Sequence, residues 1–229
     1  MTSEPTNAIG LETVSGLDLA VDPEALELQF GAGVIHPAGE RRTLDDVRAT
    51  LADPDADGPE QLYTIYMDIA DEPDLPRLLQ QQLLYGAVVY NHGAIGNERL
   101  RSQGHIHSAQ PGTGLRYSEV YEFWTGHGHV YLQKECASEV TRALLVPVGP
   151  GDKVIVPLGW VHLTVASDSE TLAFGAWCAR ENELEYGGLR ELGGPAHFVL
   201  ADGEIVANPR YARVPEVEII QPGDLPLLG

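Results

Sequence analysis

The chain has 229 residues, of which 43% are hydrophobic, so it is long and apolar enough to bury one sizeable core, and a single domain is expected. Its 34 acidic residues against 14 basic ones give a formal net charge of -20. Such a surface repels phosphate-rich polymers and anionic membranes, so neither nucleic acid nor membrane is an expected partner. A small charged substrate is not excluded, because the local charge of a site can oppose the overall sign.

Cysteine usage and the ends of the chain bear on its compartment. Cys136 and Cys178 do not make a disulfide framework. The first ten residues lack the basic and apolar regions of a secretory signal, and no stretch approaches the roughly 20 apolar residues that span a bilayer. We therefore expect a soluble cytoplasmic protein and interpret its acidity as a source of solubility.

The pattern of residues changes along the chain. Residues 1–30 are rich in Ser, Thr, Asp and Glu, which predicts an N-terminal arm with weak order. Thr43 and Asp46 form an acidic variant of a capping box, which predicts a short helix over residues 43–52 that ends at Asp53. The main domain is expected over residues 31–212, followed by an extended C-terminal arm over 213–229.

From Leu62 onward, short runs rich in β-branched and aromatic residues alternate with Gly, Pro, Asp or Asn. They predict strands at 62–69, 83–93, 99–107, 118–125, 128–133, 141–148, 153–157, 162–167 and 171–178. Many short strands without a long helical pattern between them predict an all-β barrel or a double-sheet sandwich.

Four residues of metal-ligating type stand in two segments of this β region. His105 and His107 are two apart and project from one face of a strand, because strand side chains alternate. Glu119 can return to the same point along the next strand, and His162 follows a Pro-x-Gly turn. Three imidazoles and a carboxylate suit a divalent transition metal, so these four residues are the predicted ligands.

The spacing around these residues resembles the two motifs of the cupin superfamily. The second segment, GDKVIVPLGWVH, runs from Gly151 through Pro157 to His162, and the first contains His-x-His followed by Glu119. The first segment departs from the family pattern by its long gap of eleven residues before Glu119. The resemblance implies an all-β cupin double-stranded β-helix, which is a jelly-roll barrel.

A narrower resemblance covers most of residues 32–211. The runs GHIH, SEVYEFWTGHGHVYLQ, VIVPLGWVHLTV, EYGGL and NPRY resemble the cupin-type glucose-6-phosphate isomerases, a metal-dependent family best known from archaea. The resemblance implies an isomerase of glycolysis and gluconeogenesis that acts on a sugar phosphate, with glucose 6-phosphate and fructose 6-phosphate as the expected substrates. It also implies a homodimer and one divalent metal per chain, with Fe(II) favoured and Mn, Ni or Zn as alternatives.

The resemblance also assigns roles to individual residues. It implies catalytic roles for Glu119 and Tyr186, although Glu119 as a ligand alone is an equal alternative. The residues that it implies for substrate binding are Ser102, Gly104, Tyr63, Tyr121 and Tyr186. Each tyrosine alone is more often a packing residue than a ligand contact.

Four positions depart from the family where its substrate wall is expected. Gly86 and Ala87 replace hydroxyl residues, Cys178 stands in place of a tyrosine, and Leu184 in place of a histidine. Arg116, in an enlarged loop over residues 108–118, is a candidate replacement phosphate contact, and an exposed loop arginine is the alternative. These departures keep two other functions open: a cupin oxygenase or lyase acting on another small substrate, and a non-catalytic sugar-binding cupin.

Two further features are interpreted as lying outside the site. His127 and His129 form a second His-x-His, but no carboxylate and later histidine follow them in a matching frame, so we expect a solvated hairpin tip. Glu122, three residues after Glu119, is expected on the opposite face of its strand, outside the barrel.

Overall fold

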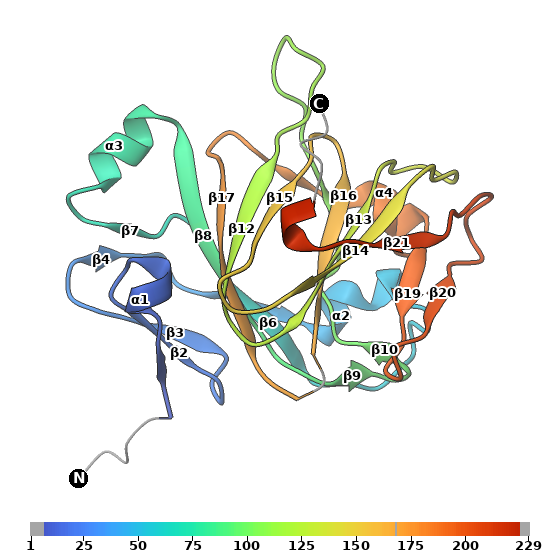
Figure 1. Cartoon of the computed structure of the whole chain (residues 1–229), viewed down its shortest axis with the longest axis horizontal. Coiled ribbons are helices and arrows are strands. Elements are labelled where there is room, and N and C mark those ends of the chain that lie inside the picture. Colours follow the sequence, from blue (N-terminus) through green and yellow to red (C-terminus); the bar gives the residue numbers. More distant parts are fainter. Residues whose placement is uncertain (1–6, 168, 225–229) are drawn as a thin grey trace.

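Two β-sheets packed face to face make up the body of the protein, in a computed structural model that describes residues 7–167 and 169–224 (Figure 1). The large sheet contains, in order, β15 (Lys153–Val156), β12 (Glu119–Thr125), β17 (Leu172–Ala179), β8 (Leu83–Tyr90), β6 (Gln61–Tyr66) and β5 (Glu40–Thr43). The small sheet contains, in order, β16 (Val161–Ala166), β13 (Gly128–Gln133), β14 (Ala143–Val148) and β21 (Val217–Ile219). The predicted all-β jelly-roll architecture of the cupins is confirmed.

The strands form because alternate residues bury apolar side chains between the two sheets. Tyr121 and Phe123 of β12 point inward, as do Val130 and Leu132 of β13, and all four belong to the central core. Pairing within both sheets is antiparallel except between β14 and β21, which run parallel. The barrel interior is therefore apolar except where the candidate site opens into it.

Residues 7–30 form regular secondary structure rather than the predicted arm with weak order. They form an antiparallel sheet of β1 (Ile9–Gly10), β2 (Leu19–Asp22) and β3 (Glu27–Phe30), with α1 (Glu12–Ser15) between β1 and β2. Leu19 and Val21 alternate along β2 with the less buried Ala20 and Asp22, and they pack in one apolar cluster with Tyr85 and Trp124 on the outer face of the large sheet. The composition of residues 1–30 did not predict this sheet, because a few apolar residues at alternate positions are enough to cover one face of a sheet.

The remaining elements are short and connect or cover the sheets. The strand pairs are β4 (Val34–Ile35) with β7 (Ala70–Asp71), β9 (Ala94–Ile95) with β10 (Glu98–Arg99), β11 (Ile106–His107) with β18 (Leu184–Glu185), and β19 (His197–Val199) with β20 (Ile205–Ala207). The helices are α2 (Leu44–Val47), η1 (Arg48–Thr50), α3 (Leu75–Gln80), α4 (Gly187–Glu191) and η2 (Pro222–Asp224). Among the described residues, no helix is long and apolar enough to cross a membrane.

The predicted capping box is confirmed at the start of α2. The backbone N–H and the hydroxyl of Thr43 both donate to the carboxylate of Asp46, at 2.8 and 2.9 Å. The helical segment continues as η1 and ends at Thr50, which is close to the predicted end.

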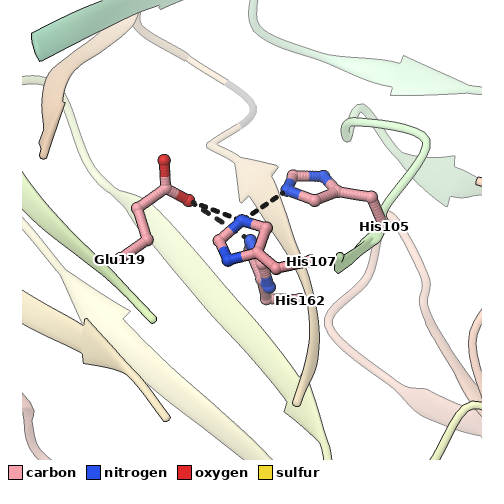
Figure 2. Close-up of side chains that lie close together, drawn as sticks. All are labelled: His105, His107, Glu119 and His162. Atoms are coloured by element: carbon pink, nitrogen blue, oxygen red, sulfur yellow. Dashed lines mark hydrogen bonds and ion pairs between the residues drawn. The ribbon is translucent and has the colours of Figure 1, made fainter. Parts of the chain in front are cut away.

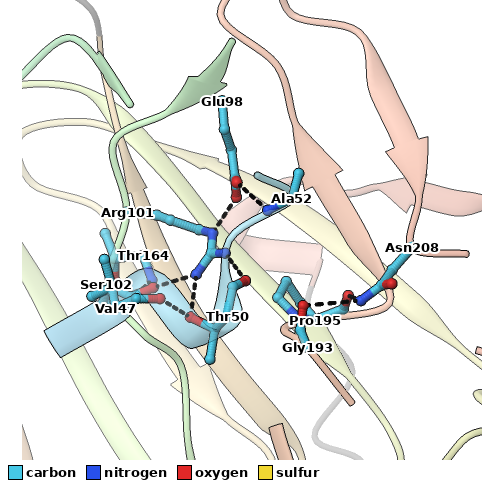
Figure 3. A network of polar contacts seen from close by, with 10 residues as sticks. All are labelled: Val47, Thr50, Ala52, Glu98, Arg101, Ser102, Thr164, Gly193, Pro195 and Asn208. Carbon is cyan, nitrogen blue, oxygen red and sulfur yellow. Dashed lines mark hydrogen bonds and ion pairs between the residues drawn. The ribbon is translucent and has the colours of Figure 1, made fainter. Parts of the chain in front are cut away.

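The strand predicted over residues 99–107 is broken into β10 and β11, and a buried polar network explains why (Figure 3). The guanidinium of Arg101, only 2% exposed, pairs with Glu98 at 2.5 Å and donates to the carbonyl and hydroxyl oxygens of Thr50. It also donates to the carbonyl of Ser102 at 2.9 Å. The backbone leaves the continuous strand so that these buried polar groups can bond to Arg101. The same network fixes the segment that leads into the histidine motif.

Candidate metal centre and substrate cavity

His105 and His162 are brought together by a short antiparallel bridge between their segments. The N–H of His105 donates to the carbonyl of His162 at 3.1 Å, and the N–H of His162 returns a hydrogen bond of 3.0 Å. Gly104 precedes the bridge with φ of +80°, and a Cβ there would lie 2.9 Å from a methyl carbon of Leu189. A glycine is therefore required at this position both by backbone conformation and by space.

Glu119 reaches the same point because the long loop before it folds back on itself. In the loop over residues 108–118, the N–H of Tyr117 donates to the carbonyl of Ser108 at 3.3 Å. A further bridge pairs Ala109 with Arg116. The eleven-residue gap is therefore a hairpin-like excursion, and its ends leave His107 and Glu119 close together.

The four predicted ligands converge on one point (Figure 2). One ligand atom from each of His105, His107, Glu119 and His162 lies within 4.8 Å of the others. Oε2 of Glu119 is 3.4 Å from Nε2 of His107 and 3.3 Å from Nε2 of His162. Atoms bound to one ion at about 2.1 Å stand roughly 3.0 to 3.4 Å apart for angles between right and tetrahedral, so this spacing fits a shared metal.

Two atoms of the cluster also indicate a metal site, because they have no hydrogen-bond partner in the described part of the chain. Oε2 of Glu119 and Nε2 of His162 are buried, and neither meets hydrogen-bond geometry with any group in the described part of the chain. These two atoms are 3.3 Å apart but are not oriented for a hydrogen bond. Buried polar atoms without partners are uncommon, and a cation between them would satisfy both.

Backbone carbonyls fix the orientation of two of the imidazoles. Nδ1 of His107 lies 3.1 Å from the carbonyl oxygen of Tyr117, and Nδ1 of His162 lies 3.2 Å from that of Trp160. A carbonyl oxygen accepts only, so each Nδ1 is the donor and each Nε2 keeps a lone pair that faces the centre.

Burial controls the charge of the cluster. Desolvation lowers the pKa of His105 well below its usual range, and it also lowers that of His162, so both are neutral at pH 7. Burial acts to raise the pKa of Glu119, but the facing His107 and His162 rings outweigh it and hold that pKa below its usual value. The centre therefore combines neutral imidazoles of His105 and His162 with an ionised carboxylate, and a metal binds these states.

One cavity is lined by all the residues that the family resemblance implies for substrate binding. It is lined by His105 and Glu119 together with Tyr63, Ser102, Gly104, Tyr121 and Tyr186. The ring of Tyr186 lies 5.7 Å from that of His105. Burial, followed by the nearby Glu119 carboxylate, raises the pKa of Tyr121 well above its usual value.

Arg42 lies beside this cavity without lining it, and it was not predicted from the sequence. It lies directly opposite Tyr63 in the pairing of β5 with β6, so both side chains point to the same face of the sheet. Its guanidinium pairs with Glu40 and lies near enough to Tyr186 to oppose the rise in the pKa of Tyr186 that burial causes. Arg190 lies 5.8 Å from the centre of the same ring. Arg42 lies in β5 and Arg190 in α4, and neither belongs to a sequence pattern that joins it to the histidine motif.

The positions that depart from the family form a largely apolar wall of the same cavity. Gly86, Ala87, Cys178 and Leu184 all line it, together with Met67. A Cβ on Gly86 would lie 2.9 Å from the carbonyl oxygen of Tyr66 and 3.2 Å from the sulfur of Met67. A hydroxyl residue therefore does not fit at Gly86, and the methionine occupies the adjacent space.

Cys178 is buried, as predicted, and its thiol is expected to resist alkylation. Burial, followed by the nearby Glu119 carboxylate, raises its pKa to about 12, so almost no thiolate exists at pH 8. Iodoacetamide at pH 8 should leave Cys178 unmodified in the folded protein and modify it after unfolding in urea. Peptide mass spectrometry reads both states, and rapid modification of the folded chain at pH 8 would refute this account.

Arg116 does not line the cavity in the described structure, so its expected phosphate contact is not found. Its guanidinium pairs with Glu185 at 2.7 Å and donates to the carbonyl of His107. It thereby ties the loop over residues 108–118 to β18. Its side chain is 32% exposed.

The second His-x-His pair and Glu122 both lie outside the site, as expected. His127 is exposed and pairs with Glu170 at 2.6 Å, and neither His127 nor His129 belongs to a ligand cluster in the described residues. Glu122 accepts hydrogen bonds from Lys153, Tyr85 and Trp177 on the outer face of the large sheet.

The family model and the curated relatives point to one family. The family model described as "Glucose-6-phosphate isomerase (GPI)" matches residues 41–216. The glucose-6-phosphate isomerase of Thermococcus kodakarensis is 29% identical over 82% of this chain and 96% of its own, and that of Thermococcus litoralis is 26% identical over 83% and 97%. Among solved structures, hazelnut vicilin is 13% identical with a TM-score of 0.42, over 56% of this chain and 33% of its own. The chain belongs to the glucose-6-phosphate isomerase family, in its cupin form.

Proposed function

We propose that the chain is a metal-dependent aldose–ketose isomerase that interconverts glucose 6-phosphate and fructose 6-phosphate. The observation that carries this proposal is the cluster of His105, His107, Glu119 and His162, which opens into the cavity lined by the expected substrate residues. Membership in the family supports the same reaction.

The four residues of the cluster would hold one divalent ion, and Fe(II) is the ion that we propose. Such an ion supplies Lewis-acid stabilisation of negative charge that develops on neighbouring substrate oxygens. Interconversion of an aldose and a 2-ketose moves hydrogen between C1 and C2. Glu119, which is ionised and lines the cavity, is the carboxylate available to carry a proton between these carbons. The buried histidine rings exclude bulk water from the same point.

Positive charge near the cavity explains how an acidic protein would bind an anionic sugar phosphate. The whole chain carries -20, yet Arg42 and Arg190 both lie beside Tyr186. Guanidinium groups bind phosphate with two parallel hydrogen bonds, which suits this role. We propose that Arg42, Tyr186, Ser102 and the backbone of Gly104 hold the phosphate.

Arg42→Gln is expected to raise KM for fructose 6-phosphate roughly tenfold or more, because a charge-assisted hydrogen bond to phosphate is lost. The matched control is Arg41→Gln on the opposite face of the same strand, where Arg41 is 61% exposed and pairs with Glu27. Steady-state kinetics of both variants test this assignment. Equal KM values for Arg42→Gln and the unchanged protein would remove Arg42 from the phosphate site.

The test of the reaction itself is a coupled assay in which fructose 6-phosphate is supplied and glucose 6-phosphate is detected through its oxidation. We expect turnover by the metal-loaded protein. A folded, metal-loaded protein that is silent in both directions would contradict the proposed reaction.

The apolar wall favours one alternative, a cupin oxygenase or lyase with a less polar substrate. Met67, Leu84 and Leu184 offer no hydrogen bonds where a sugar has hydroxyl groups. Oxygen consumption with a candidate substrate supports this alternative. Identical isomerase rates with and without oxygen count against it.

A further inference from the structure

The amide of Asn182 is buried at the cavity without any hydrogen-bond partner. Its Oδ1 and Nδ2 atoms are both inaccessible to solvent, and neither meets hydrogen-bond geometry within the described part of the chain. The residue lines the cavity that contains the candidate metal centre. An amide that is buried without hydrogen bonds lowers the free energy of unfolding. A ligand that forms hydrogen bonds with Asn182 would offset this loss.

Hydrogen bonds fix the backbone around Asn182 to the segment that carries the candidate metal ligand His107. The N–H of Asn182 donates to the carbonyl of Ala179 at 3.0 Å. The next residue, Glu183, donates to Oγ of Ser108 at 3.0 Å and accepts from the N–H of Ser108 at 2.9 Å. Because Ser108 directly follows His107, the amide and the metal centre are fixed relative to each other.

The amide lies on the Glu119 side of the cavity. Cys178 is directly opposite Glu119 in the pairing of β12 with β17, so their side chains are neighbours on one face. Asn182 is near enough to the Cys178 sulfur to oppose the rise in that thiol's pKa, yet a thiol is a weak partner and the contact falls outside hydrogen-bond geometry. The amide is thus the polar group on a wall otherwise formed by Cys178, Leu84 and Leu184.

The chemistry of an amide fits adjacent hydroxyl groups. It presents a carbonyl oxygen that accepts and an NH₂ group that donates, and each sugar hydroxyl can do either. A site that is built to bond a hydroxyl discriminates strongly against a molecule that lacks it, because its own buried group is then left unpaired.

We propose that Asn182 is a specificity-determining residue whose amide hydrogen-bonds hydroxyl groups of the open-chain sugar phosphate, on the Glu119 side of the cavity. This inference rests on the proposed isomerase function, since it takes the substrate to be a polyhydroxylated phosphate. The Asn182 amide would then supply a polar contact to the substrate on the wall where Cys178 and Leu184 replace the family's tyrosine and histidine.

The first test is Asn182→Leu in the full chain, because leucine has nearly the shape of asparagine without its polar atoms. We expect kcat/KM for fructose 6-phosphate to fall roughly 10-fold to 100-fold. We also expect Tm to stay unchanged or to rise, because the variant no longer buries an unsatisfied amide. The matched control is Glu183→Gln, an exposed neighbour in the same loop, which should keep the unchanged kcat/KM.

A purely structural role for Asn182 predicts the opposite pattern. Tm of Asn182→Leu would then fall, and kcat/KM of the folded variant would stay within about twofold of the unchanged protein. That result would overturn the proposal.

A second measurement separates this inference from the proposed reaction. Calorimetry with sorbitol 6-phosphate, a polyol phosphate without a carbonyl group, reports binding without turnover. Weaker binding by Asn182→Leu supports the role of Asn182 even if the unchanged protein does not isomerise either hexose phosphate. Equal binding by both proteins overturns the inference and leaves a measured isomerase activity standing. No binding and no turnover by the unchanged protein would overturn both.

Discussion

Replacing His162 by alanine is expected to remove the bound metal and the isomerase activity together. His162 is fully buried, its Nδ1 is committed to the carbonyl of Trp160, and its Nε2 faces Glu119. No other described side chain can take its place in the cluster. Because Lewis-acid stabilisation is worth several kcal/mol, we expect kcat/KM to fall by at least about 10³-fold.

Metal analysis and the coupled assay on the purified variant measure both effects. The matched control is His127→Ala, which removes an exposed histidine whose only ion pair is at the surface and so contributes little to stability. This control should keep its metal and its turnover. Circular dichroism must show that His162→Ala is folded. A folded, metal-free variant that still isomerises fructose 6-phosphate would refute the role of the cluster.

Arg101→Met is expected to cause a large loss of stability. The side chains of Arg101 and Glu98 are 2% and 4% exposed, and the guanidinium also bonds Thr50 and Ser102 (Figure 3). Methionine would leave the Glu98 carboxylate buried without its partner. Removing one member of such a pair lowers the free energy of unfolding by about 3–5 kcal/mol. Urea unfolding followed by circular dichroism measures this loss.

An exposed pair provides the comparison for this prediction. Arg142 bonds Glu218 through two nitrogens at 2.8 Å, but these side chains are 33% and 50% exposed. Arg142→Met should therefore cost about 1 kcal/mol or less. The double variant Arg101→Met with Glu98→Leu should regain much of the loss, because replacing both charges is often neutral. Similar losses for Arg101→Met and Arg142→Met would show that burial of the first pair is energetically unimportant.

The ligands could be predicted because their types and spacing are visible in the chain. His105 and His107 are separated by one residue, and Pro157 and Gly159 form the turn that precedes His162. The prediction of Glu119 as a ligand was correct despite the long gap before it, because the loop folds back and its ends lie close together. The strands were predictable for the same reason, since their apolar residues alternate along the chain.

Residues that act through packing could not be found in this way. Asn182 lies in a highly charged loop, and only the three-dimensional structure places its amide at the cavity without a partner. Arg42 joins the site through strand pairing with Tyr63. The order of the N-terminal sheet depends on its contact with Tyr85 and Trp124, which are far away in sequence. Local patterns do not encode such long-range contacts.

The central claim is that this cluster makes the chain a metal-dependent isomerase, and a reconstitution titration tests it most directly. The purified protein is stripped by a chelator, and Fe(II), Mn, Ni or Zn is then returned in steps while bound metal and fructose 6-phosphate turnover are both measured. We predict negligible turnover of the stripped protein and a rise that saturates at one ion per chain with at least one of the metals. Full turnover by a protein proven free of metal would contradict the account.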